Sequence, residues 1–273
     1  MYVCKNKKEK NMKHLYLTAI AIMLCIATAC NSQLATDVRM EVIFDNPQPR
    51  VMPLNLFGEV PEQLASELGI QTGIPSSVSV MYLEKDGKKM LFDAGNGNKD
   101  SQLMPRLGQL GAKAEDIDFI FITHLHGDHI GGLTHDGQRA FPKAKLYIPE
   151  KEWEGWMNTT NEAPKNIVAL AEAYGEDLIR FKENDKLPCE IKPIPAYGHT
   201  PGHTVYQIGK ILIVGDIMHG VALQMEHPEF CARFDMDQEH AIASRKEIVE
   251  LAKQKGWTMY GMHFPTTEGV RVK

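Results

Sequence analysis

The sequence predicts an α/β (α+β) protein built as a four-layer αββα sandwich, in which helices lie outside two packed sheets. Two observations indicate this fold class. Short apolar runs with the length of buried strands come first, helical segments are interleaved with them later, and the pattern occurs in two similar halves. Several of these runs also end on histidine or aspartate, as happens when a site is assembled at one edge of a sheet.

The first half begins with strands predicted at residues 40–44, 77–84 and 88–92. The last two are joined by Asp86-Gly87, which is typical of a type I′ hairpin turn. Asp93 then stands at a Gly-rich turn, where we expect its side chain to support a neighbouring loop by accepting backbone hydrogen bonds. A helix is predicted at residues 99–111, followed by a buried strand at 119–123.

The loop after this strand carries a dense group of metal-ligand side chains. It reads His124-Leu125-His126-Gly127-Asp128-His129, so three imidazoles and a carboxylate fall within six residues. His124 and His126 lie on one side of an extended segment, whereas Asp128 and His129 follow on a turn and can face a second point. The loop therefore predicts two neighbouring metal ions.

Three later segments each supply one more candidate metal ligand. His203 stands just before a strand predicted at 205–208, a wholly apolar strand at 211–215 ends on Asp216, and a further apolar stretch ends on His263. His199, at the start of the same Pro-Gly turn as His203, is expected to act in the turn or to orient a ligand, with direct metal contact as the less favoured alternative. Helices are predicted at residues 163–174 and 238–256, the latter ended by its glycine.

These motifs, in this order over residues 74–265, resemble those of the metallo-β-lactamase fold superfamily of metallohydrolases. The resemblance implies that one ion is held by His124, His126 and His203, the second by Asp128, His129 and His263, and that Asp216 bridges them. Segments 215–219, 234–237, 241–245 and 261–265 look most like the branch of methyl parathion hydrolase and N-acyl homoserine lactone lactonases. Many such lactonases have a tyrosine where this chain has His219.

The ligand set predicts a mechanism. Imidazoles and carboxylates without a thiolate suit two Zn²⁺ ions, although Mn, Co or Fe would tolerate the same atoms. A metal-bridging hydroxide would attack a lactone or ester carbonyl or a phosphotriester phosphorus. Asp128 and His219 are the predicted catalytic side chains, His219 either contacting substrate or orienting Asp216. The alternatives are a metallo-β-lactamase and a non-catalytic zinc-binding lipoprotein, the latter disfavoured because all the ligands are retained.

The candidate walls of the substrate pocket are apolar. An apolar pocket would suit acyl chains or aryl esters better than highly charged substrates. Trp153 and Trp156, three residues apart on a predicted helix, are explained as readily by packing in the core as by a role in the pocket wall. The candidates are residues 54–57, Trp153, Trp156, Met225 and Phe230.

The beginning of the chain predicts export. A lysine-rich stretch precedes a nearly uninterrupted apolar run at residues 15–29, too short for a comfortable membrane span, and small residues lead to Cys30. We interpret residues 1–30 as the leader of a periplasmic or cell-surface lipoprotein lipidated on Cys30, with ordinary secretion as the alternative. Residues 31–39 would be a tether and residues 40–273 a single hydrolase domain.

Composition limits the partners. The formal net charge of −5 and scattered lysines argue against nucleic acid as the main partner, so the predicted partner is a small-molecule substrate. Membrane contact is expected only through the lipid on Cys30, and the choice between monomer and homodimer is left open. Cys189 and Cys231 could pair in an oxidising compartment and are not expected to bind metal.

Overall fold

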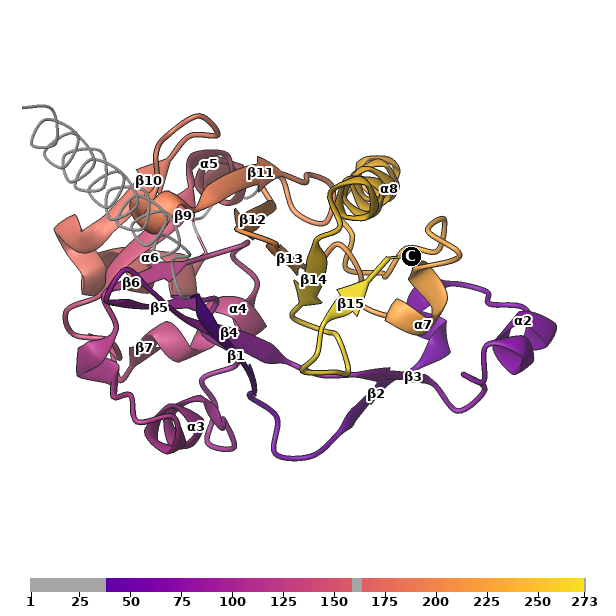
Figure 1. The fold of residues 1–273 in the computed structure, drawn as a ribbon, viewed down its shortest axis with the longest axis horizontal. Coiled ribbons are helices and arrows are strands. Elements are labelled where there is room, and N and C mark those ends of the chain that lie inside the picture. The colour runs from indigo at the N-terminus through magenta and orange to yellow at the C-terminus, as the bar shows by residue number, and fades with distance from the viewer. Residues whose placement is uncertain (1–37, 159–163, 273) are drawn as a thin grey trace, which may run out of the picture. The chain divides into compact units, whose positions relative to one another are not determined.

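The computed structural model describes residues 38–158 and 164–272 (Figure 1). Residues Arg39–Lys273 form one compact unit. The predicted leader with Cys30 and most of the tether lie outside the described residues, so the prediction of a lipid anchor stays a prediction. Within the described part of the chain, none of the helices combines the length and apolar character needed to cross a membrane.

The first sheet has six strands in the order β1-β4-β5-β6-β9-β10. The pairs β1–β4 and β4–β5 are antiparallel, whereas β5, β6, β9 and β10 run parallel to one another. Positive φ angles at Asp86 (54°) and Gly87 (71°) give the β4–β5 hairpin the turn geometry that the sequence predicted. The strands are β1 (Arg39–Phe44), β4 (Ser79–Lys85), β5 (Lys88–Phe92), β6 (Phe119–Phe121), β9 (Lys145–Pro149) and β10 (Leu178–Phe181).

The second sheet has five strands in the order β11-β12-β13-β14-β15. Its central pair, β13 and β14, is parallel, so the carboxyl ends of these two strands meet at the same edge. The strands are β11 (Lys192–Pro195), β12 (Thr204–Ile208), β13 (Ile211–Gly215), β14 (Thr258–Gly261) and β15 (Val270–Arg271). Short two-stranded sheets join β2 (Arg50–Met52) to β3 (Ile74–Ser76) and β7 (Thr134–His135) to β8 (Gln138–Arg139).

Aromatic side chains pack the two main sheets against each other. The ring of Tyr206 on β12 lies 5.4 Å from that of Phe92 on β5 and 5.8 Å from that of Phe121 on β6, measured between centroids. The Tyr206 hydroxyl also donates a hydrogen bond to the carbonyl of Ile122 (2.6 Å). Such contacts make the sheets the two middle layers of the fold.

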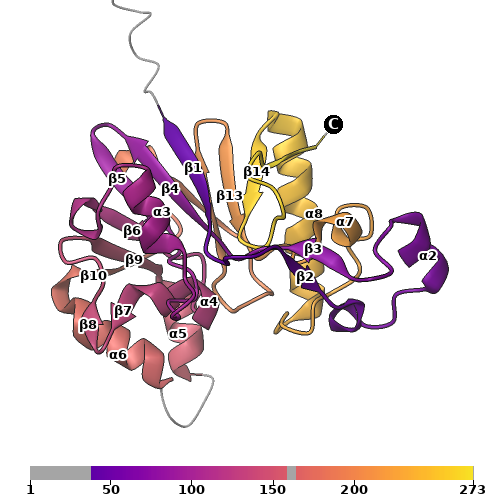
Figure 2. The same ribbon diagram turned by 90° about the horizontal axis from the view of Figure 1, so that it is seen from below.

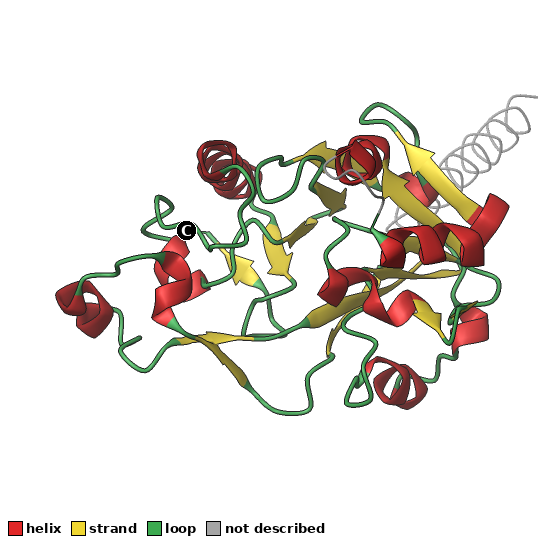
Figure 3. Cartoon of the chain, turned by 180° about the vertical axis from the view of Figure 1, so that it is seen from behind, coloured by secondary structure: helices red, strands yellow, loops and turns green. Residues whose placement is uncertain are grey.

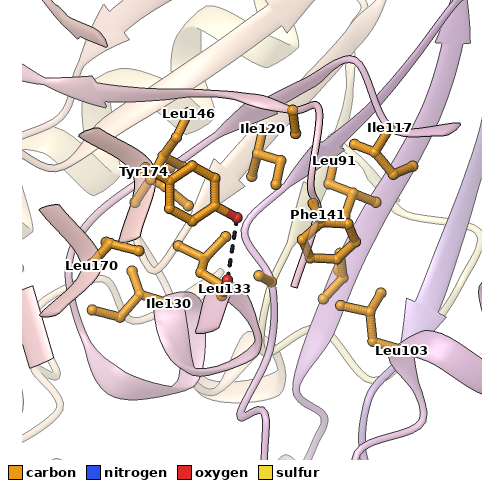
Figure 4. Packing of buried hydrophobic residues seen from close by; sticks show 14 of the residues in the cluster. Leu91, Leu103, Ile117, Ile120, Ile130, Leu133, Phe141, Leu146, Leu170 and Tyr174 are labelled. Atoms are coloured by element: carbon orange, nitrogen blue, oxygen red, sulfur yellow. Dashed lines mark hydrogen bonds between the residues drawn. The ribbon is translucent and has the colours of Figure 1, made fainter. Parts of the chain in front are cut away.

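Helices cover the outer faces of the sheets (Figures 2 and 3). The first sheet is covered by α3 (Leu103–Gln109) and α6 (Lys165–Tyr174), whose buried residues join one apolar cluster with the strands (Figure 4). Within it, the Tyr174 hydroxyl donates to the Leu133 carbonyl (3.2 Å). The second sheet is covered by α8 (Gln238–Lys255) through Ile248 and Ala252. The predicted αββα sandwich is therefore confirmed.

The helix boundaries differ from prediction where side chains intervene. Helix α3 begins four residues after the predicted start, because the buried Asp45 carboxylate accepts hydrogen bonds from the Ser101 hydroxyl and the Gln102 and Leu103 amides and holds these residues in a turn. Helix α8 agrees closely with prediction, with Asp237 as its N-cap and Gly256 in the left-handed conformation. The remaining helices are α2 (Glu62–Glu67), α4 (Gly127–Ile130), α5 (Glu150–Asn158) and α7 (Val221–Gln224).

Candidate metal centre

The histidine-rich loop follows β6 directly and is fixed by the strand beside it. Asp93, which follows β5, accepts hydrogen bonds from the backbone amide of Thr123 (2.7 Å) and its hydroxyl (2.7 Å). The same carboxylate accepts from Nδ1 of His129 (2.6 Å). Asp93 therefore gives the support that the sequence predicted, and it also orients the last histidine of the loop, which lies on α4.

The centre contains closely spaced donor atoms from both sheets. Among the residues that the structure describes, five groups of three side chains each bring one potential ligand atom within 4.8 Å of the others. Most of these side chains are buried. The groups are His124, His126, His199; His124, His129, Asp216; Asp128, His129, His263; His199, His219, Asp235; and Asp216, His219, His263.

The structure brings His199, and not His203, to the first two histidines. Nε2 of His199 lies 3.1 Å from Nε2 of His124 and 3.0 Å from Nδ1 of His126, and these last two atoms are 3.0 Å apart. By contrast, Nε2 of His203 accepts the backbone amide of Asp216 (2.9 Å), and its Nδ1 donates to the Ala196 carbonyl (3.1 Å). Both ring nitrogens of His203 are thus engaged within the protein, so we replace it by His199 in the proposed ligand set.

Hydrogen bonds from Nδ1 orient the imidazoles of His199 and His263 toward the centre. Nδ1 of His199 donates to Oδ1 of Asp235 (2.9 Å), whose other oxygen accepts from the buried Arg245 guanidinium (3.2 Å). Nδ1 of His263 donates to the Ser77 carbonyl (2.8 Å). Such partners fix the tautomer and leave Nε2 as the atom available to a metal.

Asp216 is the central carboxylate of the centre. Its Oδ2 lies 3.0 Å from Nε2 of His263, 3.3 Å from that of His129 and 3.5 Å from that of His199. Three buried polar atoms among the described residues have no hydrogen-bond partner in the protein: Nε2 of His129, Oδ1 of Asp216 and Nδ1 of His219. Unpaired buried polar atoms of this kind are costly unless something else binds them, and imidazole and carboxylate donors fit divalent cations well.

The electrostatics of the centre follow from burial and from Asp216. Burial opposes the charge on Asp216, but the imidazoles around it, His129 first, hold the pKa of that carboxyl well below its usual range. Burial, followed by repulsion from His199, lowers the pKa of His126 to about 3. Burial opposes protonation of His129 and His263, but the charge of Asp216 raises the pKa of both imidazoles, so a metal that binds them must displace their protons.

Two predicted catalytic residues lie at this centre. Asp128 is about a third exposed, with Oδ2 3.6 Å from Nε2 of His263 and Oδ1 3.7 Å from that of His129. The buried His219 places Nε2 3.2 Å from Oδ2 of Asp216 and stacks on the His263 ring with centroids 5.0 Å apart. The contact to Asp216 favours the orienting role for His219 over the substrate contact that the sequence also left open.

Most of the predicted pocket walls pack elsewhere. Trp156 does lie at the centre, with its ring 5.5 Å from that of His126. Trp153 packs against the apolar cluster of the first sheet, and Met225 against that of the second. Phe57 is buried in a separate apolar cluster, against which Leu54, Leu56 and Phe230 pack. The aromatic residue beside His219 is instead Phe234, with centroids 5.6 Å apart and a 42 % exposed surface.

Three buried residues that support the centre were not among the predicted site residues: Glu152, Asp235 and Arg245. Asp235 and Arg245 lie in segments that carried the family resemblance, which was the one signal available for them. Glu152 lies on α5 among other charged residues, and nothing in the local pattern distinguishes it from a solvent-exposed glutamate.

Residues 73–263 match the family model described as the metallo-beta-lactamase superfamily, which is more than half of the chain. The chain belongs to the metallo-β-lactamase superfamily. The predicted superfamily is thereby confirmed.

Similar proteins agree with this membership. The structure of a hydrolase of the same superfamily, AbOPH, is 26 % identical with a TM-score of 0.77, and the match covers 87 % of this chain and 90 % of that one. The structure of AidC, a dizinc quorum-quenching lactonase, is 23 % identical with a TM-score of 0.75 over 84 % and 88 % of the chains, which shows a shared fold.

A curated relative, the exodeoxyribonuclease WalJ of Streptococcus pneumoniae, is 39 % identical over 98 residues, covering 34 % of this chain and 35 % of the relative. The chain thus spans about a third of the length of that relative. The hydrolase named for the first structure and the nuclease named for the curated relative agree with the predicted class of metal-dependent hydrolase.

Proposed function

We propose that this protein is a binuclear zinc hydrolase that acts on a lactone, an ester or a phosphotriester. The observation that carries the proposal is the position of Asp216, whose carboxylate lies among histidines from both proposed ligand groups while one of its oxygens has no partner in the protein. In the proposed ligand set, His124, His126 and His199 hold one ion, and Asp128, His129 and His263 hold the second. Asp216 is shared by both.

The chain's own side chains have distinct tasks in this reaction. Two divalent cations bound at these ligands would lower the pKa of a shared water and so supply a hydroxide nucleophile at neutral pH. Asp93, Asp235 and Ser77 hold the imidazoles in the required tautomers. The side chain of Asp128 is 31 % exposed, so its carboxylate can meet a substrate and take up or return a proton.

Neutral or weakly charged substrates fit the surroundings of the centre better than polyanions. The exposed apolar side chains Phe234 and Met236 flank Asp235 next to the centre, and the whole chain carries a formal net charge of −5. An apolar rim favours acyl or aryl groups, and a negative net charge disfavours long-range attraction of nucleic acid. We therefore place lactones, esters and phosphotriesters before nucleic acids.

A metal analysis with a substrate panel tests the proposal. We expect about two zinc ions per chain after purification, and hydrolysis of an acyl homoserine lactone, an aryl ester or a paraoxon-like triester that a chelator abolishes and zinc restores. The panel also includes a chromogenic cephalosporin and short DNA and RNA strands. Fewer than one metal per chain would contradict the binuclear centre, and turnover of only the cephalosporin or only a nucleic acid would reassign the substrate class.

We predict that His219 acts through Asp216. His219→Ala should weaken zinc binding about tenfold or more, because the carboxylate loses the imidazole at 3.2 Å that orients it. His219→Gln, which can present a donor to the same oxygen, should recover part of the affinity. Zinc affinities are measured by competition with a chromophoric chelator. Unchanged zinc affinity with a raised KM would instead assign His219 to substrate contact.

A further inference from the structure

Glu152 is a buried carboxylate outside the proposed ligand set. It lies in the first turn of α5, and its side chain is completely buried. Among the described residues, several donate hydrogen bonds to this carboxylate. Burial raises the pKa of the Glu152 carboxyl, and these hydrogen bonds oppose the rise. A buried carboxylate is costly unless its oxygens are hydrogen-bonded, so Glu152 and its donors are strongly coupled to one another.

Three of the donors come from the two loops that carry the proposed ligands of the first ion. Oε1 accepts the backbone amide of Leu125 (2.9 Å), the residue between His124 and His126. Oε2 accepts the hydroxyl of Thr200 (2.7 Å), which follows His199, and the amide of Gly202 (2.8 Å). One carboxylate therefore joins the segment before α4 to the segment before β12.

A second contact from the same helix reaches a proposed ligand directly. Nε1 of Trp156, one turn after Glu152, donates to Oε1 of Glu152 (2.6 Å), and the Trp156 ring packs edge-on against His126 with centroids 5.5 Å apart. The backbones also approach closely, since a Cβ added at Gly202 would lie 2.0 Å from the Glu152 amide nitrogen. Helix α5 is thus docked firmly onto the loop that carries His199.

We propose that Glu152 is a positioning residue that sets the distance between the His124–His126 pair and His199, and so determines the affinity of the first metal site. The inference rests on the proposed function, because it assumes that these three histidines hold an ion. The second site, formed by Asp128, His129 and His263, has other supports in Asp93 and Ser77 and does not depend on Glu152.

Glu152→Gln tests the inference with almost no change in volume. An amide has one acceptor oxygen and an NH₂ group, so in either orientation the NH₂ faces the backbone amide of Leu125 or that of Gly202 and one loop is released. We expect the zinc dissociation constant of the first site to rise about ten- to hundredfold while that of the second site changes little. The full chain is titrated with zinc against a chromophoric chelator, and the absorption spectrum of the cobalt-loaded protein reports the geometry.

Glu150→Gln is the matched control. It makes the same chemical change on the same helix, but Glu150 is partly exposed and is 3.7 Å from Arg180, so both zinc constants should stay as in the wild type. A folded Glu152→Gln protein with both wild-type constants and the wild-type cobalt spectrum would overturn the inference.

If Glu152→Gln does not fold, Thr200→Val decides the matter. It removes a single donor from Oε2 and should weaken the first site about fivefold; wild-type zinc constants in this variant would likewise overturn the inference. If the wild-type chain itself does not bind zinc, the proposed function is contradicted as well. If the wild type binds zinc and the variants bind it equally well, only the role of Glu152 is contradicted.

Discussion

Asp216→Ala is expected to lower kcat/KM about a thousandfold or more, which corresponds to about 4 kcal/mol of transition-state stabilisation. The reason is that one carboxylate contacts histidines of both proposed ligand groups, His129 and His263 of the second and His199 of the first, at 3.0 to 3.5 Å. Without it the two ions lose their shared ligand, and zinc content should fall from about two per chain to one or fewer. Elemental analysis and steady-state kinetics with the substrate identified from the panel measure both effects.

Asp237→Ala provides the control for this variant. Asp237 is an exposed aspartate that caps α8 by accepting the His240 amide (3.1 Å), and its loss should lower the unfolding free energy slightly without changing zinc content or kcat/KM. An Asp216→Ala protein that keeps two zinc ions and wild-type kinetics would rule out the binuclear centre.

Local patterns in the sequence predicted the fold because most elements are determined by local properties. Strand β5 and the β4–β5 turn follow from an apolar run and from Asp86-Gly87, and α8 from its amphipathic pattern and Gly256. The start of α3 could not be predicted in this way. It depends on Asp45, more than fifty residues earlier in the chain, whose carboxylate binds the turn before the helix.

The metal centre shows the same division between local and distant effects. The dense loop from His124 to His129 predicts a site without any tertiary information. Local sequence cannot decide between His199 and His203, since both stand in one Pro-Gly turn. Their roles are separated by distant partners: Asp235 orients His199, whereas the backbone amide of Asp216 occupies His203. The family resemblance implied His203 as the ligand, but its imidazole lies between two backbone groups inside the fold.

The roles of these two histidines predict opposite behaviour on substitution. We expect His199→Ala to weaken zinc binding at the first site about a hundredfold or more, because a proposed ligand is itself removed. Loss of a residue that only supports a ligand costs about ten- to hundredfold in metal affinity. The ring lies within 3.1 Å of the donor atoms of both His124 and His126, so no other side chain can take its place without moving them. Zinc titration and kcat/KM on the same preparation give the measurement.

His203→Ala should instead act on stability. It leaves the Asp216 amide and the Ala196 carbonyl without their partners and opens a cavity, which together cost about 2 to 4 kcal/mol of unfolding free energy. Zinc affinity should change less than about tenfold, because neither ring nitrogen faces the donor cluster. Urea unfolding of the zinc-free proteins separates the two variants from each other. If His203→Ala lost the first zinc ion while His199→Ala kept it, the ligand set first implied by the family resemblance would be correct and the one proposed from the geometry would be wrong.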